Sequence, residues 1–308
     1  MVAVRAVWAS SSRTSAFRKE ALQGFLCIVP WLLGFLIFTA GPMVASLWLS
    51  TTDYEILRPI HFIGSGNFTR ALRDPLFSKS LWNTAFYTGL YVPLHILTAL
   101  LAAILLNTNV HGKGIYRVIF YVPSIMPAVA NVFLWMWIFN PEYGLANALL
   151  NVFGLPPQKW LYSADLAKPS FVIMALWGLG SAMLIFLAGL QGIDPVLYEA
   201  SSIDGASAWT KFWRITLPML TPTLFFNLTM GIIGSFQVFT TAFIATGGGP
   251  NNATLFYVLY IYRQGWEFTR MGYAAALAWV LFAIILLVTL IQFRMAGRWV
   301  YYEVERKG

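Results

Sequence analysis

Two apolar stretches of the chain are joined by the segment Gln191-Gly-Ile-Asp-Pro-Val-Leu-Tyr-Glu-Ala-Ser-Ser-Ile-Asp-Gly-Ala-Ser-Ala-Trp-Thr-Lys-Phe-Trp-Arg-Ile-Thr-Leu-Pro218. Asp194 can accept a hydrogen bond from a free amide at a helix start, and Pro195 suits the first turn, where its missing N–H costs nothing. We therefore expect a short helix that ends near Ile203. Gly205 supplies a left-handed residue that terminates it, and a second helix follows over about 206–216.

This segment is too apolar to be a free loop. Large or apolar side chains recur along both expected helices: Leu197, Tyr198, Ala200, Ile203, Ala206, Trp209 and Phe212. Apolar patches of this kind on a protein surface mark sites of association. We expect another protein surface to cover them.

The composition places the chain in a membrane. Of its 308 residues, 58% are hydrophobic and only 10% are charged, whereas about 25% of the residues of a soluble domain are charged. The net charge is +8, but the basic residues flank hydrophobic segments, which is a signal of membrane orientation and disfavours nucleic acid as a partner. The single cysteine, Cys27, lies in an apolar run and indicates no disulfide, redox or metal site.

Six stretches are long enough to cross a membrane, which takes about 20 apolar residues. The run from Ile215 to Tyr262 carries no charge and is too long for one helix, and Thr246-Gly-Gly-Gly-Pro-Asn-Asn252 breaks it. The expected spans are about 22–49, 80–106, 115–139, 169–190, 219–244 and 272–293.

The Lys and Arg residues between the spans set the expected orientation, because positively charged loops stay on the cytoplasmic side. With the N-terminus inside, twelve of the 20 fall in inner segments and eight in outer ones. We expect cytoplasmic tails over 1–20 and 295–308, a membrane domain over 21–294, and the segment 191–218 on the cytoplasmic face. The apolar run after residue 20 is longer than a signal-peptide core of about 7–15 residues, so we expect a retained helix.

The spans contain almost no ionisable groups. Apart from Arg117 at the mouth of the third span, His95 is the exception. Transporters driven by ion gradients keep charged residues within the membrane, so this pattern disfavours them. The sequence also lacks a phosphate-binding G-x-x-x-x-G-K-[ST], an H-E-x-x-H and a G-x-S-x-G motif. Any energy for transport must therefore come from a partner.

Polar and aromatic residues within the spans indicate a pocket for an uncharged polyol. Amides, hydroxyls and aromatic faces bind sugars, in line with the general pattern of apolar pockets with a few oriented polar groups. The same residues are also compatible with ordinary hydrogen bonds between helices. The polar residues are His95, Asn131, Ser181, Asn227, Ser235 and Gln237, and the aromatic ones are Trp135, Trp177, Phe236 and Phe239.

The loop resembles a known family. Glu199-Ala200, Asp204-Gly205-Ala206 and Leu217-Pro218 are similar to the EAA loop of permease subunits in binding-protein-dependent ABC importers, with Ser201 where the family has a further Ala. Trp299-Val-Tyr-Tyr-Glu303 resembles the MalF-like branch, which includes lactose and glycerol-3-phosphate permeases. The resemblance extends over about 22–303 and implies an all-α membrane protein with six transmembrane helices in the type I importer permease fold.

The resemblance implies partners and a place in the cell. These are a second, MalG-like permease in a heterodimer, an ABC ATPase dimer, an extracytoplasmic solute-binding protein and membrane lipid, in a bacterial or archaeal cytoplasmic membrane. The ATPase would bind ATP and Mg, so no cofactor, metal site or catalytic residue is expected in this chain. The loop residues implied to couple to the ATPase are Tyr198, Glu199, Ala200, Asp204, Gly205, Ala206, Leu217 and Pro218.

Alignment with the maltose-importer half implies a solute path on spans four and five: Trp177, Gly178, Ser181, Ser235, Phe236, Gln237 and Phe239. Asn131 is added on physical grounds. The family's asparagine-rich stretch in span five is replaced here by Gly234-Ser-Phe-Gln-Val-Phe239, so a maltodextrin site does not follow. Two alternatives remain open at this point: a channel or facilitator that needs no ATPase, and a scaffold subunit whose sister permease alone contacts solute.

Overall fold

The computed structural model describes residues 15–56, 58–108 and 111–301. Over these residues the chain is helical, and an isolated bridge between Thr52 and Phe62 is the one β-type pairing. The predicted tails 1–20 and 295–308 lie partly outside the described residues. The all-α prediction is thus confirmed for the part of the chain that the structure describes.

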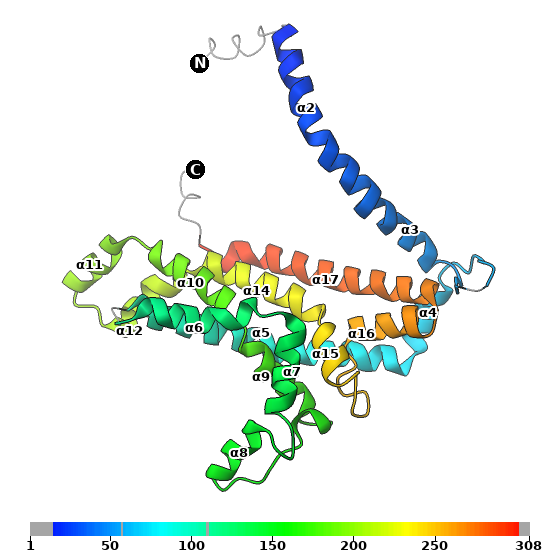
Figure 1. Cartoon of the computed structure of the whole chain (residues 1–308). Coiled ribbons are helices and arrows are strands. Elements are labelled where there is room, and N and C mark those ends of the chain that lie inside the picture. Colours follow the sequence, from blue (N-terminus) through cyan, green and yellow to red (C-terminus); the bar gives the residue numbers. More distant parts are fainter. Residues whose placement is uncertain (1–14, 57, 109–110, 302–308) are drawn as a thin grey trace.

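The body of the molecule is a bundle of long helices. Figure 1 shows them running side by side from the end that carries α11 (Pro195–Ile203) to the end that carries α4 (Gly66–Arg73). The bundle contains α5 (Pro75–Asn107), α6 (Lys113–Ile125), α10 (Gly180–Gln191), α14 (Thr221–Phe236) and α17 (Met271–Trp299).

The first helical rod leans away from this bundle (Figure 1). It consists of α2 (Ser15–Phe35), a π-helical turn (Leu36–Ala40) and α3 (Gly41–Ser50). Only α3 packs on the bundle, against α17. Along α2 the large apolar side chains stay exposed, with Trp31 at 69%.

Close packing of α5 against α10 holds together the half of the bundle that carries α11, which we call the inner half. Ala99 and Ala103 on α5 are fully buried, and such small residues let neighbouring membrane helices approach closely. Gly189 on α10 has the same effect toward α14, because a Cβ there would lie 2.7 Å from the Thr223 hydroxyl oxygen. Larger side chains, including Phe186, fill the remaining space.

Sharp bends interrupt three of the apolar segments. The largest, 101°, separates α6 from α7 (Ala128–Ile138). It lies at Met126, which takes an extended conformation because Pro127 follows. Bends of 49° and 62° separate α9 (Ala167–Leu176) from α10, and the segment Ala208–Met219 from α14.

Among the described residues, three helices are long and apolar enough to cross a membrane: the rod from Leu22 to Ser50, α5 and α17. Up to six segments qualify if each bent pair counts as one span. The predicted six spans and their boundaries stay predictions, because the helices satisfy only the criteria of length and composition for a membrane span. Within the predicted fifth span the helix is in pieces, because α14 ends at Phe236 and α15 (Thr240–Ala245) starts anew.

Two short elements pack on the half of the bundle that carries α4, which we call the outer half: α16 (Tyr257–Tyr262) and a π-helical turn (Arg263–Glu267). Two others lie below the bundle in Figure 1: α8 (Leu145–Val152), which packs on α7, and a 3₁₀ turn (Trp160–Tyr162), which packs on α9. α16 packs against both α5 and α17. The loop 246–256 runs between α15 and α16.

One buried amide ties this loop to α5. Asn83 Nδ2 donates to the carbonyl oxygens of Asn252 (2.8 Å) and Leu255 (3.2 Å). Asn83 Oδ1 accepts from Lys168 Nζ at 3.1 Å, so a residue at the start of α9 joins the same cluster. In a lipid-facing protein, loop carbonyls away from water need such partners.

We predict that Asn83→Ala destabilises the purified protein by about 1–3 kcal/mol, since it leaves buried carbonyl groups without donors. Thermal unfolding in detergent measures the loss. Asn151→Ala, which truncates an exposed amide on α8, is the matched control. Equal unfolding temperatures for the two variants would contradict the role of Asn83.

Candidate functional site: the loop 191–218 and the central groove

Helix α11 starts as the sequence predicts. The Asp194 carboxylate accepts from the Val196 N–H at 2.9 Å, and Pro195 occupies the first turn. Gly205 has φ +71°, and the end of the helix forms two reversed hydrogen bonds: Gly205 N–H to Ser202 O (3.1 Å) and Ala206 N–H to Ser201 O (2.9 Å). This pattern is the Schellman motif, which glycine favours.

The second helix of the loop starts later than the predicted Ala206. Because the Ala206 N–H is used by the Schellman motif, the new helix is capped by Ser207, whose hydroxyl oxygen accepts from the Thr210 N–H at 3.2 Å. α12 (Ala208–Lys211) then continues through a π-helical turn (Phe212–Thr216) and α13 (Leu217–Met219). Only Leu220 separates α13 from α14.

Hydrogen bonds brace the two arms of the loop. The hydroxyl groups of Tyr198 and Thr216 lie 2.9 Å apart, and Lys211 Nζ donates to Ser202 Oγ at 2.6 Å. The Tyr198 hydroxyl group therefore points toward the other arm of the loop. These bonds join the two arms into one unit, the knuckle, which we define as residues 194–218.

The outer surface of the knuckle is apolar and open. Ile203 is 88% exposed and Trp209 is 71% exposed. The predicted coupling residues Glu199, Ala200, Asp204 and Gly205 are exposed beside them, whereas Ala206, Leu217 and Pro218 are half-buried. Figure 1 places α11 and α12 at the extreme end of the bundle, where a partner has free access.

A groove of about 510 Å³ lies between α5, α10 and α14. It brings together two of the predicted solute-path residues, Ser181 and Ser235, and adds the amide of Asn227. The wall on α5 is aromatic, with Tyr87, Tyr91 and His95. The two tyrosines were missed by sequence reasoning, although their spacing of four residues, continued by His95, signals one face of a helix.

Other predicted solute-path residues lie beside this groove or away from it. Trp177 and Gly178 sit at the bend between α9 and α10, and the Trp177 ring meets Trp135 edge-on at 5.8 Å. Asn131 Oδ1 and Trp135 Nε1 on α7 are buried without a hydrogen-bond partner among the described residues. Phe236 is buried in the core and Gln237 is exposed at the end of α14.

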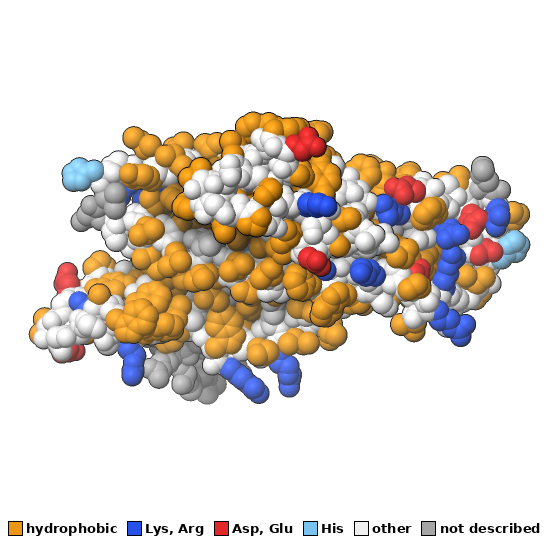
Figure 2. Space-filling view, turned by 90° about the horizontal axis from the view of Figure 1, so that it is seen from below, with side chains coloured by type: hydrophobic (Ala, Val, Ile, Leu, Met, Phe, Trp, Pro, Cys, Tyr) orange, Lys and Arg blue, Asp and Glu red, His pale blue; other side chains and the backbone are white. Residues whose placement is uncertain are grey.

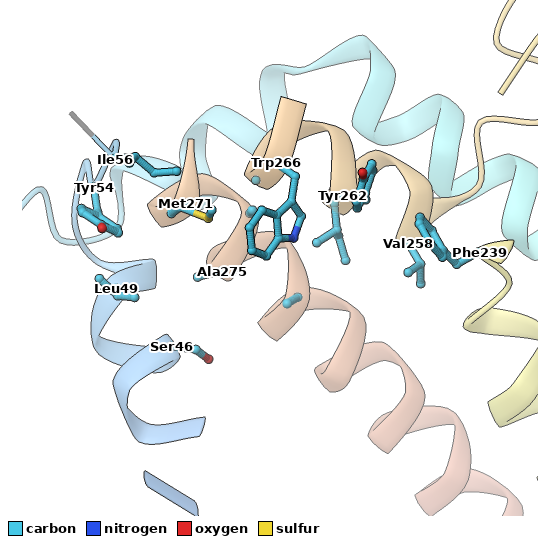
Figure 3. Close-up of a pocket in the computed structure, with 14 residues that line it drawn as sticks. Ser46, Leu49, Tyr54, Ile56, Phe239, Val258, Tyr262, Trp266, Met271 and Ala275 are labelled. Carbon is cyan, nitrogen blue, oxygen red and sulfur yellow. The ribbon is translucent and has the colours of Figure 1, made fainter. Parts of the chain in front are cut away.

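Phe239 lies in a different pocket. This second cavity, of about 680 Å³, opens between α3, α16 and α17, and its lining is almost entirely apolar. Figure 3 shows Phe239 and Val258 at one side of the cavity and Tyr54 and Ile56 at the other. The Phe239 ring contacts Tyr262 at 5.1 Å. The structure thus separates Phe239 from the groove that holds Ser181 and Ser235.

Figure 2 shows one face of the molecule, on which charged groups are densest toward the end that carries α4 and hydrophobic side chains cover much of the remainder. At the end that carries α4, the Asp74 carboxylate accepts from the Leu76 N–H (2.8 Å) and from the hydroxyl groups of Tyr260 and Tyr273. Burial alone would raise the pKa of Asp74, but these hydrogen bonds outweigh it and hold the pKa below its ordinary value. Within the described residues, no group of three or more His, Cys, Asp or Glu could hold a metal ion.

Residues 95–300 match the family model described as "Binding-protein-dependent transport system inner membrane component". This chain belongs to that family. It is 41% identical to the "Probable ABC transporter permease protein YesP" of Bacillus subtilis, over 96% of this chain and 97% of that protein. It is 35% identical to the arabinooligosaccharides permease AraP of the same species (91% and 90%) and 32% identical to the trehalose/maltose permease MalF of Thermococcus litoralis (90% and 94%).

The solved structures support the same fold. A bacterial alginate ABC transporter, crystallised with its alginate pentasaccharide-bound periplasmic protein, contains a chain that superposes with a TM-score of 0.81 at 25% identity, covering 91% of this permease and 96% of that chain. The predicted importer permease fold is confirmed. The chain is an inner-membrane transport subunit and not an enzyme, and its family implies an ATPase and a solute-binding protein as partners.

Replacing Gly205 tests the Schellman motif of the permease. Gly205→Ala keeps the left-handed conformation at a cost of about 1 kcal/mol, so hydrogen exchange of the amides that close α11 should accelerate about fivefold. Gly192→Ala is the control, because φ is −81° there and a Cβ meets neighbours only at 3.5 Å or more. Unchanged exchange in Gly205→Ala would contradict the motif's contribution.

A second prediction concerns Asp74. Because its pKa is lower in the folded state than the ordinary value of about 3.9, its carboxylate contributes stability that is complete above that pH and is lost as the pH falls through the folded-state pKa. Asp74→Asn should lower the unfolding temperature at neutral pH, and the gap to the wild type should narrow as the pH falls below the ordinary carboxyl pKa of about 3.9. The exposed Asp165, changed to Asn, is the control. A gap that does not depend on pH would count against this role of Asp74.

Proposed function

We propose that this permease forms part of the membrane path of an ATP-driven importer for a saccharide that an extracytoplasmic binding protein delivers. The carrying observation is the exposed, hydrogen-bonded knuckle at one end of a chain whose relatives are sugar permeases. Relatives named for arabinooligosaccharides, trehalose/maltose and lactose support a sugar as the cargo. A channel or facilitator that works without an ATPase gains no support from this family membership.

The knuckle is the proposed contact with the ATPase. Ile203 and Trp209 present apolar surface that the permease leaves uncovered, and Glu199 adds a charge at its side. ATP and Mg bind to the ATPase, which supplies the energy. Nucleotide shifts the permease between its states only through contacts that differ between them, and the knuckle is where such contacts form.

Movement at the knuckle reaches the groove through helical segments that meet at the 62° bend before α14. From Ser207 the chain runs through α12, the π-helical turn and α13 into α14, which carries Asn227 and Ser235 on the groove wall. Leu217 and Pro218 lie at the start of this connection. A rotation of the knuckle therefore changes the position of the groove wall relative to α5.

The groove is the proposed solute path, with Ser181 and Ser235 as hydrogen-bonding groups for sugar hydroxyls. Trp177, Gly178 and Asn131 would join it when the bends between paired helices change. Phe236, Gln237 and Phe239 are weaker candidates in this conformation, because one is buried, one is exposed beyond the groove and one lines the other pocket. The scaffold alternative predicts instead that changes in the groove leave transport unaltered.

A second, MalG-like permease is the proposed partner within the membrane. The support is the rod from Leu22 to Ser50, since most of its large apolar side chains are exposed. In lipid, helices associate through packing of such surfaces. A heterodimer would cover the rod and close the groove from its open side.

Glu199→Lys tests the docking of the ATPase. We expect the variant to insert into the membrane and to lower binding-protein-stimulated ATP hydrolysis by the assembled transporter about tenfold, as loss of a charged hydrogen bond of about 1.5 kcal/mol implies. Glu142→Lys, at an exposed position beside α8, is the matched control. ATP hydrolysis at the wild-type rate in Glu199→Lys would sink the proposed contact.

Crosslinking gives an independent measurement. In a Cys27→Ser background, which removes the one native cysteine, a cysteine at the exposed Ser202 should crosslink to the ATPase in membranes. Crosslinks that never include an ATPase subunit would overturn the docking assignment.

A further inference from the structure

The cavity that holds Phe239 opens on the surface of the bundle between α3, α16 and α17, and its lining is almost entirely apolar. Figure 3 shows Trp266 between Met271 and Tyr262 in the middle of this lining. Trp266 is 69% exposed although it lines the cavity. An apolar ligand seated there would cover a large aromatic surface that the chain itself leaves open.

The cavity exists because α17 presents small side chains toward α3. Ala274, Ala275 and Ala278 line it on α17. One residue further along the helix, Trp279 Nε1 donates to Ser46 Oγ on α3 at 3.0 Å, which ties the two helices together at this end of the cavity. The result is a gap between two apolar helices that a flexible apolar chain can enter.

The cavity lies where a membrane changes from hydrocarbon to headgroups. α17 has 29 residues and rises about 43 Å, which matches about 40–45 Å for a bilayer with its headgroup regions. Its first residue, Met271, lines the cavity. Tyr54 and Trp266 add the kinds of ring that concentrate at membrane interfaces. Headgroups should therefore lie beside one end of the cavity and acyl chains beside the other.

A charged pocket of about 340 Å³ adjoins the cavity at the headgroup end. Tyr54 lines both spaces, and Arg70 and Arg270 line the pocket. The Arg70 guanidinium lies 4.6 Å from the centre of the Tyr273 ring, and that of Arg270 lies 5.7 Å from the centre of the Phe268 ring. Among the described residues, neither arginine forms an ion pair.

The acidic residues of this pocket have other partners. The Asp53 carboxylate accepts from the His61 N–H at 2.7 Å, and Glu55 pairs with Arg58 at 3.0 Å. The two arginines of the pocket are thus left for an anion from outside the chain. A phosphate group suits them, because guanidinium groups bind phosphate oxygens through charge-assisted hydrogen bonds.

We propose that the cavity and the adjoining pocket bind one anionic phospholipid, with an acyl chain between α3 and α17 and the phosphate group at Arg70 and Arg270. A phospholipid carries both chemistries in one molecule, and the membrane around the permease supplies it. The site goes beyond the proposed function, since it does not depend on the cargo.

A helix of the proposed sister permease is the alternative occupant, and it fits the site less well. The rod separates from the bundle along α2 (Figure 1), whereas the cavity lies at the other end of the rod, where α3 packs on α17. An apolar helix seated in the cavity would leave Arg70 and Arg270 without an anion. A phospholipid satisfies both parts of the site.

Lipid binding to the assembled transporter tests the charged part of the site. The complex with its sister permease and ATPase is titrated with phosphatidylglycerol, or with phosphatidylcholine of the same acyl chains, and bound lipid is counted by native mass spectrometry. We expect the wild type to bind one phosphatidylglycerol at least tenfold more tightly than phosphatidylcholine. Arg270→Gln should weaken this binding about tenfold, the loss expected when one charged hydrogen bond disappears. Lys159→Gln, at an exposed position outside both spaces, is the matched control.

A second variant tests the apolar part of the site. Ala278 lines the cavity and is exposed on α17, so Ala278→Phe adds a ring there without entering the core. The added ring competes with the acyl chain, and phosphatidylglycerol binding should fall at least fivefold. Ala283→Phe, the same change at an exposed position of α17 outside the cavity, is the matched control and should bind lipid as the wild type does.

A photoreactive side chain identifies the occupant in the membrane, and it covers the case in which the other variants fail to assemble. The transporter carries p-benzoylphenylalanine in place of Trp266, which keeps an aromatic side chain at the mouth of the cavity. After irradiation of membranes that contain phosphatidylglycerol, mass spectrometry should find a phospholipid joined to this position. An adduct with the sister permease, and none with lipid, overturns the proposal.

The titrations can also overturn it. Equal affinity of the wild type for the two lipids, or binding by Arg270→Gln at the wild-type affinity, removes the anionic headgroup from the site. Undiminished binding by Ala278→Phe removes the acyl chain from the cavity, and an equal loss in the control variants removes the site altogether. Saccharide uptake by the transporter is a separate measurement, so the proposed function stands or falls independently of these results.

Discussion

The contacts of α5 are the constraint on which the rest of the permease depends. Its inner half is held by buried alanines against α10, and its outer half by the Asn83 amide, which satisfies carbonyl groups of the loop 246–256. Without water nearby, neither part has an alternative: close packing needs small side chains and loop carbonyls need donors. The groove lies along the middle of α5, between these two contacts, where Tyr87, Tyr91 and His95 line it together with residues of α10 and α14.

The local features of the knuckle could be predicted from the sequence because short-range rules determine them. Asp194, Pro195 and Gly205 each act through backbone groups a few residues away, and the structure confirms all three. The later start of the second helix was missed because it depends on a competition for one N–H, that of Ala206. The all-α membrane character likewise follows from composition, which no tertiary contact alters.

The arrangement of the candidate site was less predictable, because it depends on bends and on contacts between distant segments. Ser181 and Ser235 are brought together as expected, but Phe239 falls into another pocket because α14 ends at Phe236 and the chain turns before α15. The tyrosines of α5 resemble ordinary core residues in the sequence, and only the packing of α10 and α14 shows that one side of their stack is open.

The splayed first rod has a consequence for biogenesis. Lipid tails are as apolar as the side chains of the rod, so an unpaired rod costs little while it is surrounded by lipid. The subunit can therefore persist in the membrane before the proposed second permease joins it. Assembly with that proposed partner would then be a separate, second stage within the bilayer, and its rate would depend on how often the two subunits meet in the plane of the membrane.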